Sequence, residues 1–180
     1  VVDIAANINN MEVINLSKFE CKIKYVVFEK KEDLHLKALN AYRPNLFDIS
    51  ESLILVSDIR NCLLYDTTGH FITAIGRLGR GPGEYSYVTN ASIGNNKIYI
   101  STLYDLMEYF TDGSYIGCYP KTFLVEDQYF IPNWIVINDT LFFGHVSNST
   151  GNKAYKALII NKKGNIKKSF NNYIQFSREQ

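Results

Sequence analysis

Short hydrophobic runs that alternate with polar residues recur along the chain, and glycine-containing turns separate them. Residues 53–76, 97–119 and 140–170 all follow the order strand, gap, strand, glycine turn, strand. Short runs rich in aromatic and β-branched residues, with no long stretch that keeps a helical period, predict β-strands. The nearest approach to a helix, residues 17–39, contains the strand-like run KIKYVVF and allows at most a short helical turn. The sequence therefore predicts an all-β protein.

The turn glycines set the period of this repeat. They are Gly69, Gly113 and Gly164, separated by 113 − 69 = 44 and 164 − 113 = 51 residues. The extra residues of the longer unit fall in the polar insertion VSNSTGNK. The turns DTTG, FTDG and NKKG each precede an apolar strand. Glycine at this point suits a hairpin whose type I turn ends in a left-handed residue.

A period of ~40–50 residues with about four strands is typical of a β-propeller blade. The innermost strands are expected near residues 45–49, 87–93 and 133–137. A β-sandwich with regular hairpins is the structural alternative. We expect a single domain over 1–180. Residues 1–40 would form an N-terminal strand segment outside the repeat, and 41–180 about three four-stranded antiparallel blades plus the start of a fourth at 171–180.

Three blades are too few to close a ring, because closed propellers have ~4–8. The sequence therefore predicts an incomplete ring. Either the chain is a piece of a longer protein, or its open blade edges associate with further chains. In a closed ring, a stretch such as residues 11–29 often supplies the outer strand of the last blade.

The amino-acid composition and net charge restrict the kinds of binding partner that we expect. The chain is 46% hydrophobic and 21% charged with a net charge of +1, which gives no reason to expect nucleic-acid binding. The lysines of NKKGNIKK (161–168) are expected on a solvated hairpin tip. No apolar run approaches the ~18 residues that a membrane helix requires.

The cysteines predict no metal site. Cys21, Cys62 and Cys118 are far apart, and their odd number leaves at least one free thiol unless a bond forms between chains. We expect all three to be small buried residues.

The segment GRLGRGPGEY (76–85) is the first candidate for chemistry. A phosphate-binding loop needs free N–H groups that open into a helix, but Pro82 has none and the following residues predict a strand. We interpret the segment as a connector between blades in which Glu84 pairs with Arg77 or Arg80. Those three residues and Tyr85 are also ligand-binding candidates.

Two further ligand-binding candidates lie later in the chain. His145 ends the strand LFFGH and could approach the ring's axis, and Trp134 is one of several aromatic residues in or beside loops. Exposed aromatic rings could stack on sugars or hold a peptide, although packing between blades is the favoured role. Loop carboxylates such as Asp58 and Asp105 are expected to bond their local backbone. The sequence predicts no catalytic residue, metal or cofactor.

Residues 63–88 resemble the six-bladed β-propeller proteins of Gram-negative gut bacteria, an exported or lipoprotein family similar in shape to NHL-repeat propellers. The opening INLSKFECKIKYVVFEKKED (14–33) is a weaker match. The residues that carry the stronger resemblance are Tyr65, Asp66, Gly69, Phe71, Ile75, Gly76, Gly79, Gly81, Pro82, Gly83, Glu84 and Tyr85. The chain corresponds to about half of such a member. The resemblance implies export to the periplasm or the outer membrane, with a lipid anchor upstream of this chain.

These observations predict an extracytoplasmic binding or scaffold protein whose ligand is a glycan, a peptide or a protein. The alternative is a lyase or hydrolase, with or without a metal, whose active site lies at the propeller axis. The sequence favours the non-enzymatic protein and leaves the enzyme open.

Overall fold

The computed structural model describes residues 24–32, 34, 36, 46–120 and 134–176. These residues form fourteen strands and no helix. Twelve of the strands make three four-stranded antiparallel sheets, and two short strands form a parallel pair. The first sheet, blade 1, contains β1 (Leu46–Ile49), β2 (Leu53–Ser57), β3 (Cys62–Asp66) and β4 (Phe71–Ala74).

The other sheets follow the same plan, with strands side by side in chain order. Blade 2 contains β7 (Asn90–Gly94), β8 (Lys97–Ser101), β9 (Asp105–Phe110) and β10 (Tyr115–Pro120). Blade 3 contains β11 (Trp134–Val136), β12 (Leu141–His145), β13 (Tyr155–Asn161) and β14 (Ile166–Asn171). Between blades 1 and 2 lie β5 (Arg77–Leu78) and β6 (Glu84–Tyr85).

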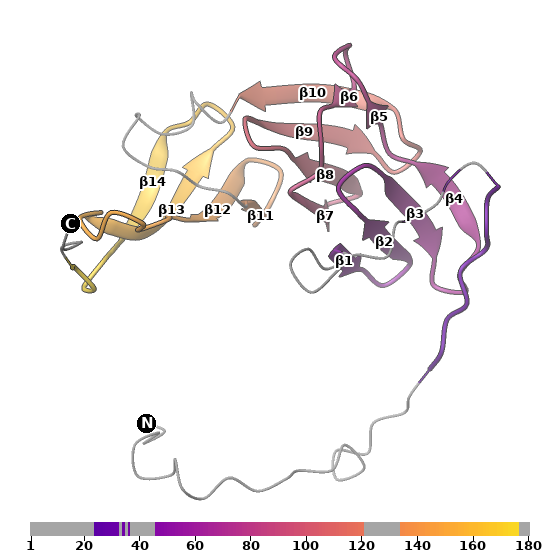
Figure 1. Cartoon of the computed structure of the whole chain (residues 1–180), viewed down its shortest axis with the longest axis horizontal. Helices are drawn as coiled ribbons and strands as arrows, with labels where there is room; N and C mark the ends of the chain where they lie inside the picture. Colours follow the sequence, from indigo (N-terminus) through magenta and orange to yellow (C-terminus); the bar gives the residue numbers. More distant parts are fainter. Residues whose placement is uncertain (1–23, 33, 35, 37–45, 121–133, 177–180) are drawn as a thin grey trace, which may run out of the picture.

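The three sheets stand along an arc, and the first strand of each, β1, β7 or β11, lies toward its concave side (Figure 1). This arrangement confirms the predicted propeller-type blades in an incomplete ring. The predicted inner strands are also confirmed, since β1, β7 and β11 lie within or within one residue of the expected ranges.

The glycine turns form as predicted. Gly69, Gly113 and Gly164 have φ values of 96°, 87° and 83°, which a residue with a Cβ adopts only with strain. Each donates its N–H to the carbonyl three residues earlier, as in the Gly69–Asp66 bond of 3.0 Å. A register shift in each hairpin shows the bulge that accompanies such turns. The repeat in the amino-acid sequence therefore corresponds to a repeat of hairpin structure.

Neighbouring blades pack flank against flank, a flank being either broad face of a blade. Alternate residues of a strand point to opposite flanks, so each blade can cover both neighbours. Between blades 1 and 2, Leu55 and Leu64 meet Ile98, Ile100 and Tyr109 in one buried cluster. A second cluster between blades 2 and 3 joins residues of both sheets: Tyr99, Leu106, Trp134, Phe142, Leu158 and Ile160. The core thus lies between the sheets.

Two polar side chains join the inner strands directly. Asp48 of β1 accepts a hydrogen bond of 2.7 Å from the backbone N–H of Ile93 in β7. Asn90 of β7 donates its side-chain N–H to the backbone carbonyl of Trp134 in β11 at 3.3 Å. These bonds fix the position of each blade along its neighbour near the concave side.

The described N-terminal residues cover the outer part of blade 1. Val26 and Phe28 pack against the flank that faces away from blade 2, and the ring of Phe28 lies 4.6 Å from that of Tyr65. Glu29 donates its backbone N–H to Gly69 at 2.8 Å, and its carboxylate accepts a bond of 3.0 Å from the N–H of Phe71. The segment thus runs against the β3–β4 hairpin, apart from the four strands of the blade.

The C-terminal residues that are described do not begin a new strand. Asn172 and Phe176 donate their backbone N–H groups to Ala154 and Gly151, so residues 172–176 run beside the β12–β13 loop. Residues 177–180 and Cys21 lie outside the described part of the chain. The start of a fourth blade therefore stays a prediction.

Candidate functional site

The segment that connects blades 1 and 2 is built around a tight turn. Gly81 accepts a hydrogen bond of 3.0 Å from the N–H of Glu84, with Pro82 and Gly83 between them. Gly83 has a φ of 72°, and proline followed by a left-handed glycine defines a type II turn. The strands on either side, β5 and β6, pair in parallel. The sequence GPGE therefore specifies the shape of this loop.

Glu84 organises the rest of the loop. Its carboxylate accepts hydrogen bonds from the backbone N–H groups of Gly81 (2.9 Å) and Arg80 (3.0 Å) and from Nε of Arg77 (2.7 Å). The bond from Gly81 and the partnership with Arg77 lower the pKa of Glu84. The predicted pairing with Arg77 is present, whereas Arg80 contributes its backbone. The carboxylate is thus engaged in holding the loop.

Beside this loop lies a cleft of about 270 Å³. It opens between the connector, the β8–β9 turn and the outer strands of blade 2, and it mixes polar and apolar groups. The lining residues are Gly79, Arg80, Gly81, Glu84, Tyr85, Ser86, Thr102, Asp105, Met107, Tyr115 and Cys118. A space of this size accommodates a single side chain or sugar ring, since pockets for larger small molecules occupy ~300–1,000 Å³.

The thiol in this cleft is not activated. Burial, the charge of Asp105 and a hydrogen bond to Asp105 raise the pKa of Cys118 to about 11, so it stays protonated at neutral pH. Cys62, in contrast, is buried in the cluster between blades 1 and 2, where burial raises its pKa further. The expectation of a small buried residue thus holds for Cys62, whereas Cys118 is exposed.

Two of the predicted ligand-binding residues are core residues. Tyr85 is 2% exposed between blades 1 and 2, and Trp134 is 1% exposed between blades 2 and 3. Burial raises the pKa of Tyr85. Both rings fill the interfaces, which agrees with the packing role favoured above. Neither ring lies at the surface.

The remaining candidate ligand-binding residues lie in different parts of the molecule. Arg77 and Arg80 are exposed on the connector, whereas His145 is exposed at the end of β12. Asp58 accepts bonds from the backbone N–H groups of Arg60 and Asn61, as expected for a turn carboxylate. Within residues 24–32, 34, 36, 46–120 and 134–176, no group of three or more His, Cys, Asp and Glu side chains could hold a metal ion.

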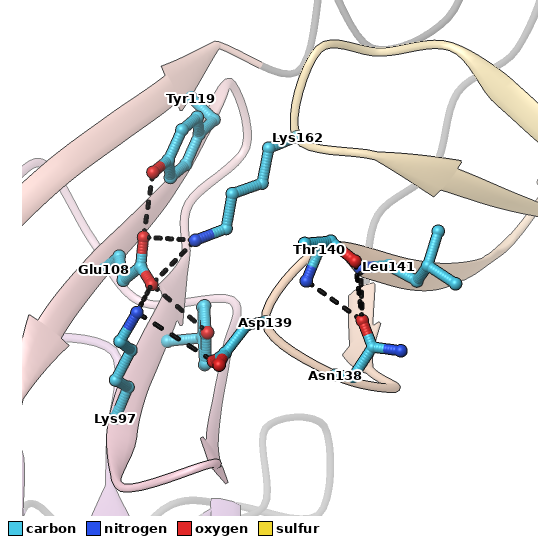
Figure 2. A network of polar contacts seen from close by, with 9 residues as sticks. Lys97, Glu108, Tyr119, Asn138, Asp139, Thr140, Leu141 and Lys162 are labelled. Carbon is cyan, nitrogen blue, oxygen red and sulfur yellow. Dashed lines mark hydrogen bonds and ion pairs between the residues drawn. The ribbon is translucent and has the colours of Figure 1, made fainter.

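A charged cluster that the sequence reasoning missed lies between blades 2 and 3 (Figure 2). At its centre is the carboxylate of Glu108 on β9, which is 0% exposed. It accepts bonds of 2.8 Å from Nζ of Lys97 and of Lys162, and bonds from the hydroxyls of Tyr119 (2.8 Å) and Tyr99 (3.2 Å). Because Lys162 belongs to the β13–β14 turn, the cluster joins the two blades.

The β11–β12 turn adds a second carboxylate. Asn138 accepts hydrogen bonds of 2.9 Å from the backbone N–H groups of Thr140 and Leu141, which shapes the turn (Figure 2). Asp139 then lies 3.9 Å from Nζ of Lys97. Two lysines thus face two carboxylates, and the cluster has no net charge.

The proton affinities in the cluster reflect these contacts. Burial by itself would raise the pKa of Glu108, but the bonds from Lys162, Lys97 and Tyr119 outweigh it and lower the pKa to about 2. The bond to Glu108 raises the pKa of Lys97. Burial and the bond to Glu108 raise the pKa of Tyr119 to about 12. Glu108 is therefore a charged, fully bonded group that joins the blades, and it is poorly suited to exchange protons with a substrate.

The sequence did contain a signal for this cluster. Glu108 is the single charged residue within the run LMEYF, and it stands five residues before its turn glycine, where blade 1 has Leu64 and blade 3 has Ile159. A charge at a position that is apolar in the other repeats predicts a buried partner. The expectation of a solvated tip for residues 161–168 was wrong for Lys162, because its ammonium group reaches Glu108.

Three meander sheets, packed flank to flank along an arc with their first strands innermost, are the blades of a β-propeller. The chain belongs to a family described as a domain of unknown function (DUF4934), whose model matches residues 1–180. Comparison with curated proteins gives no match.

Solved structures show the same fold. The chain is similar to the crystal structure of a Bacteroides fragilis protein described as a candidate exported protein, with a TM-score of 0.66 and 16% identity. The likeness covers 86% of this chain and 43% of the other, so the chain spans less than half of that neighbour's length. The WD40 β-propeller domain of Doa1 is also similar, with a TM-score of 0.50 and 10% identity over 72% of this chain and 40% of that one.

The described residues include no helix that is long and apolar enough to cross a membrane.

Proposed function

We propose that this chain forms part of an exported, six-bladed β-propeller that acts as a binding or scaffold protein. The observation that carries the proposal is the cleft beside the GPGEY loop. It lies where the connector and the β8–β9 turn meet, and loops held by a rigid scaffold are where propellers and other β folds place their ligand contacts. The ligand is a glycan, a peptide or a protein segment that presents one ring or side chain to the cleft.

The chemistry of the cleft supports binding. Arg80 and Asp105 supply opposite charges, Ser86 and Thr102 supply hydroxyl groups, and Tyr115 and Met107 supply apolar surface. Such a mixture orients a ligand through a few polar contacts while burying part of its surface. The loop itself is pre-organised, because Glu84 already holds it in one shape, and this reduces the entropy lost on binding.

Export is supported by the resemblance of residues 63–88 to exported propellers and by the description of the Bacteroides fragilis neighbour. We place the protein in the periplasm or at the outer membrane, with a lipid anchor upstream of this chain. Fractionation of cells that express the full gene with an epitope tag tests this. The tag should appear with periplasmic or outer-membrane markers, and recovery with cytoplasmic markers would reject export.

The enzyme alternative receives no support from the described residues. A lyase or hydrolase would need convergent polar groups at the axis, yet His145 lies at the end of a second strand, and Asp58 bonds its own turn. We therefore propose binding without catalysis.

Binding is tested by NMR on the ¹⁵N-labelled chain with monosaccharides, oligosaccharides and short peptides. A ligand of the cleft should shift the amides of Arg80, Ser86 and Thr102 and leave the amide of Lys163, in the β13–β14 turn, unchanged. Arg80→Ala and Asp105→Asn should weaken the shifts, with Lys163→Ala as the matched control. Shifts confined to other parts of the chain would reject the cleft as the site.

A further inference from the structure

The side chains that line the cleft beside the GPGEY loop restrict the class of ligand that fits it. Every lining residue lies between Gly79 and Cys118, so the walls come from the connector and from blade 2. The connector strands β5 and β6 stand beside β9 and β10, the outer strands of that blade (Figure 1). The selectivity of the cleft can therefore be argued from residues that the structure describes.

The backbone of the connector wall is already bonded internally. The N–H groups of Arg80 and Gly81 donate to the carboxylate of Glu84. The N–H of Gly79 donates to the carbonyl of Tyr85 at 3.0 Å, and the N–H of Glu84 donates to that of Gly81. An extended peptide relies on main-chain hydrogen bonds to its receptor, and these four N–H groups are not available for it. Recognition at this wall therefore depends on side chains.

Two charged side chains of opposite sign supply the polar contacts. Arg80 lines the cleft from the connector, and Asp105 lines it from the start of β9. In the described part of the chain the guanidinium of Arg80 enters no ion pair, because Glu84 pairs with Arg77. The carboxylate of Asp105 accepts a hydrogen bond from the thiol of Cys118, and a carboxylate has about four acceptor positions. Both groups can therefore still bond to a ligand.

The charges at the cleft cancel. Arg77 and Arg80 balance Glu84 and Asp105, so this part of the surface has no net charge. An anionic ligand would be repelled by Asp105 and a cationic ligand by Arg80, and such contacts between like charges are costly. A hydroxyl group is both a donor and an acceptor, so adjacent hydroxyls can bond to the guanidinium and the carboxylate together. The charges therefore favour an uncharged ligand with several hydroxyl groups.

An aromatic ring forms an apolar wall. Tyr115 of β10 lines the cleft and is 37% exposed. Its ring lies 5.6 Å from that of Tyr109, edge to face, and a Cβ on Gly83 would come within 3.0 Å of the Cβ of Tyr115. A second ring, that of Tyr104, is 62% exposed in the β8–β9 turn, where its N–H donates to the hydroxyl of Thr102. Rings held in this way offer an apolar face at a low entropy cost.

We propose that the cleft binds one pyranose ring of an uncharged glycan. The apolar C–H face of the sugar packs on Tyr115, its hydroxyl groups bond to Arg80 and Asp105, and Tyr104 contacts its outer edge. A pyranose has this division between an apolar face and a polar rim, and the cleft volume of about 270 Å³ suits a single ring. The inference rests on the proposed function, because it names the ligand class of the same cleft.

Saturation-transfer NMR with a panel of methyl glycosides tests the proposal. The panel contains neutral hexosides and N-acetylhexosaminides, together with a hexuronide and an aminohexoside as charged counterparts. A neutral glycoside should receive saturation mainly at the C–H protons of one ring face, and it should shift the amide and Nε–H signals of Arg80 in ¹⁵N spectra. The charged counterparts should bind about tenfold more weakly or less, because each meets one like charge.

Variants of the cleft assign the contacts. Tyr115→Leu removes the aromatic face and should weaken binding about threefold to tenfold. Asp105→Asn keeps the shape of the side chain but removes its charge, and it should weaken binding about tenfold. Phe110→Leu is the matched control, since Phe110 is a 49% exposed aromatic residue at the far end of β9 and does not line the cleft.

Circular dichroism of each variant verifies folding. If Tyr115→Leu unfolds, Tyr104→Leu replaces it, because Tyr104 lies on the surface of a turn and its removal leaves the sheet intact. This variant should weaken binding about twofold to threefold, the lower part of the range for a contact with one aromatic ring.

Three results would overturn the inference: cleft amides that respond to short peptides and to none of the glycosides, charged glycosides that bind as tightly as neutral ones, or affinities unchanged by both cleft variants. In the first case the cleft remains a binding site, so the proposed function survives the loss of the glycan. Cleft amides that respond to no glycoside and no peptide would reject both the inference and the proposed function.

Discussion

The two interfaces between blades use the same backbone plan but opposite chemistry. Between blades 1 and 2, the position five residues before the turn glycine holds Leu64, which packs among aliphatic and aromatic side chains. Between blades 2 and 3, the same position holds Glu108, which is equally buried but bonds to two lysines and two tyrosines. The repeat therefore determines where side chains meet and leaves their chemistry open.

The difference has energetic consequences. An apolar interface loses stability in proportion to the surface and volume removed. A buried ion pair contributes little net stability over apolar residues of similar size, but it becomes strongly destabilising when one partner is removed. We therefore expect the interface between blades 2 and 3 to lose stability when one of its charged residues is neutralised. The interface between blades 1 and 2 should lose stability when a charged residue is introduced.

The largest effect should come from Leu64→Glu. This change places a carboxylate at the position in blade 1 that corresponds to Glu108 in blade 2. The described neighbours of Leu64 include no lysine that could pair with it. An unpaired buried charge costs on the order of 4 kcal/mol or more. Urea unfolding followed by circular dichroism measures the loss. Ile159→Glu at the same place in blade 3 is the matched control and should change stability by less than about 1 kcal/mol, because Ile159 is only half-buried and no described blade covers that side of blade 3. Similar losses for both variants would contradict the comparison.

Removal of one lysine from the cluster should have the next largest effect. Lys162→Met keeps the length of the side chain but leaves Glu108 with Lys97 as its remaining cation, and we expect a loss of about 2–3 kcal/mol. Lys163→Met, one residue further along the same turn, should stay within about 0.5 kcal/mol of the unaltered chain. The same urea titration measures both. Equal stability of the two variants would mean that the cluster does not join the blades.

Acid should weaken the second interface selectively. The pKa of Glu108 is lowered from 4.5 to about 2 in the folded chain, so the unfolded state takes up the proton first. The stabilisation is complete above pH 4.5 and is lost as the pH falls from there through about 2. The difference in unfolding free energy between the unaltered chain and Glu108→Gln should therefore shrink over this range. A difference that is constant from pH 6 to pH 2 would contradict the ionised form of Glu108.

The smallest effect is expected from Arg77→Ala. The Arg77–Glu84 ion pair is as short, at 2.7 Å, as the pairs of Glu108, but the arginine side chain is 81% exposed. Exposed pairs contribute about 0–1 kcal/mol, and Glu84 keeps its two backbone donors. Thermal unfolding of this variant at low and high salt measures the contribution. A loss of stability as large as that of Lys162→Met would show that burial does not explain the difference between the Arg77–Glu84 pair and the Lys162–Glu108 pair.

Local sequence was sufficient for the features that depend on neighbouring residues. The turn glycines Gly69, Gly113 and Gly164 were predictable because a left-handed backbone at the end of a type I turn favours glycine. The GPGE turn was predictable as a bend for the same reason, although the three bonds to Glu84 were not. Short apolar runs in β2, β8 and β12 indicated the strands, and the repetition of these runs indicated the class of fold.

Features that join distant residues were not predictable in detail. The sequence did not determine whether the rings of Trp134 and Tyr85 are exposed or buried. Both rings are buried because the blades pack against each other around them. Glu108 and Lys162 are 54 residues apart, and their contact depends on the angle between two sheets. The cleft likewise depends on how the connector folds back over β9 and β10. Periodicity specifies a blade, but the relation between blades arises from tertiary packing.

The hydrogen bond between Glu29 and Phe71 spans 42 residues, and it has a consequence for the order in which the molecule is made. During synthesis the N-terminal segment emerges first, but its docking site against the β3–β4 hairpin does not exist until that hairpin has emerged and paired. Over this interval Val26 and Phe28 have no apolar surface to cover them. Completion of blade 1 therefore waits on its last strand, and until that strand has paired the apolar side chains of the segment stay exposed.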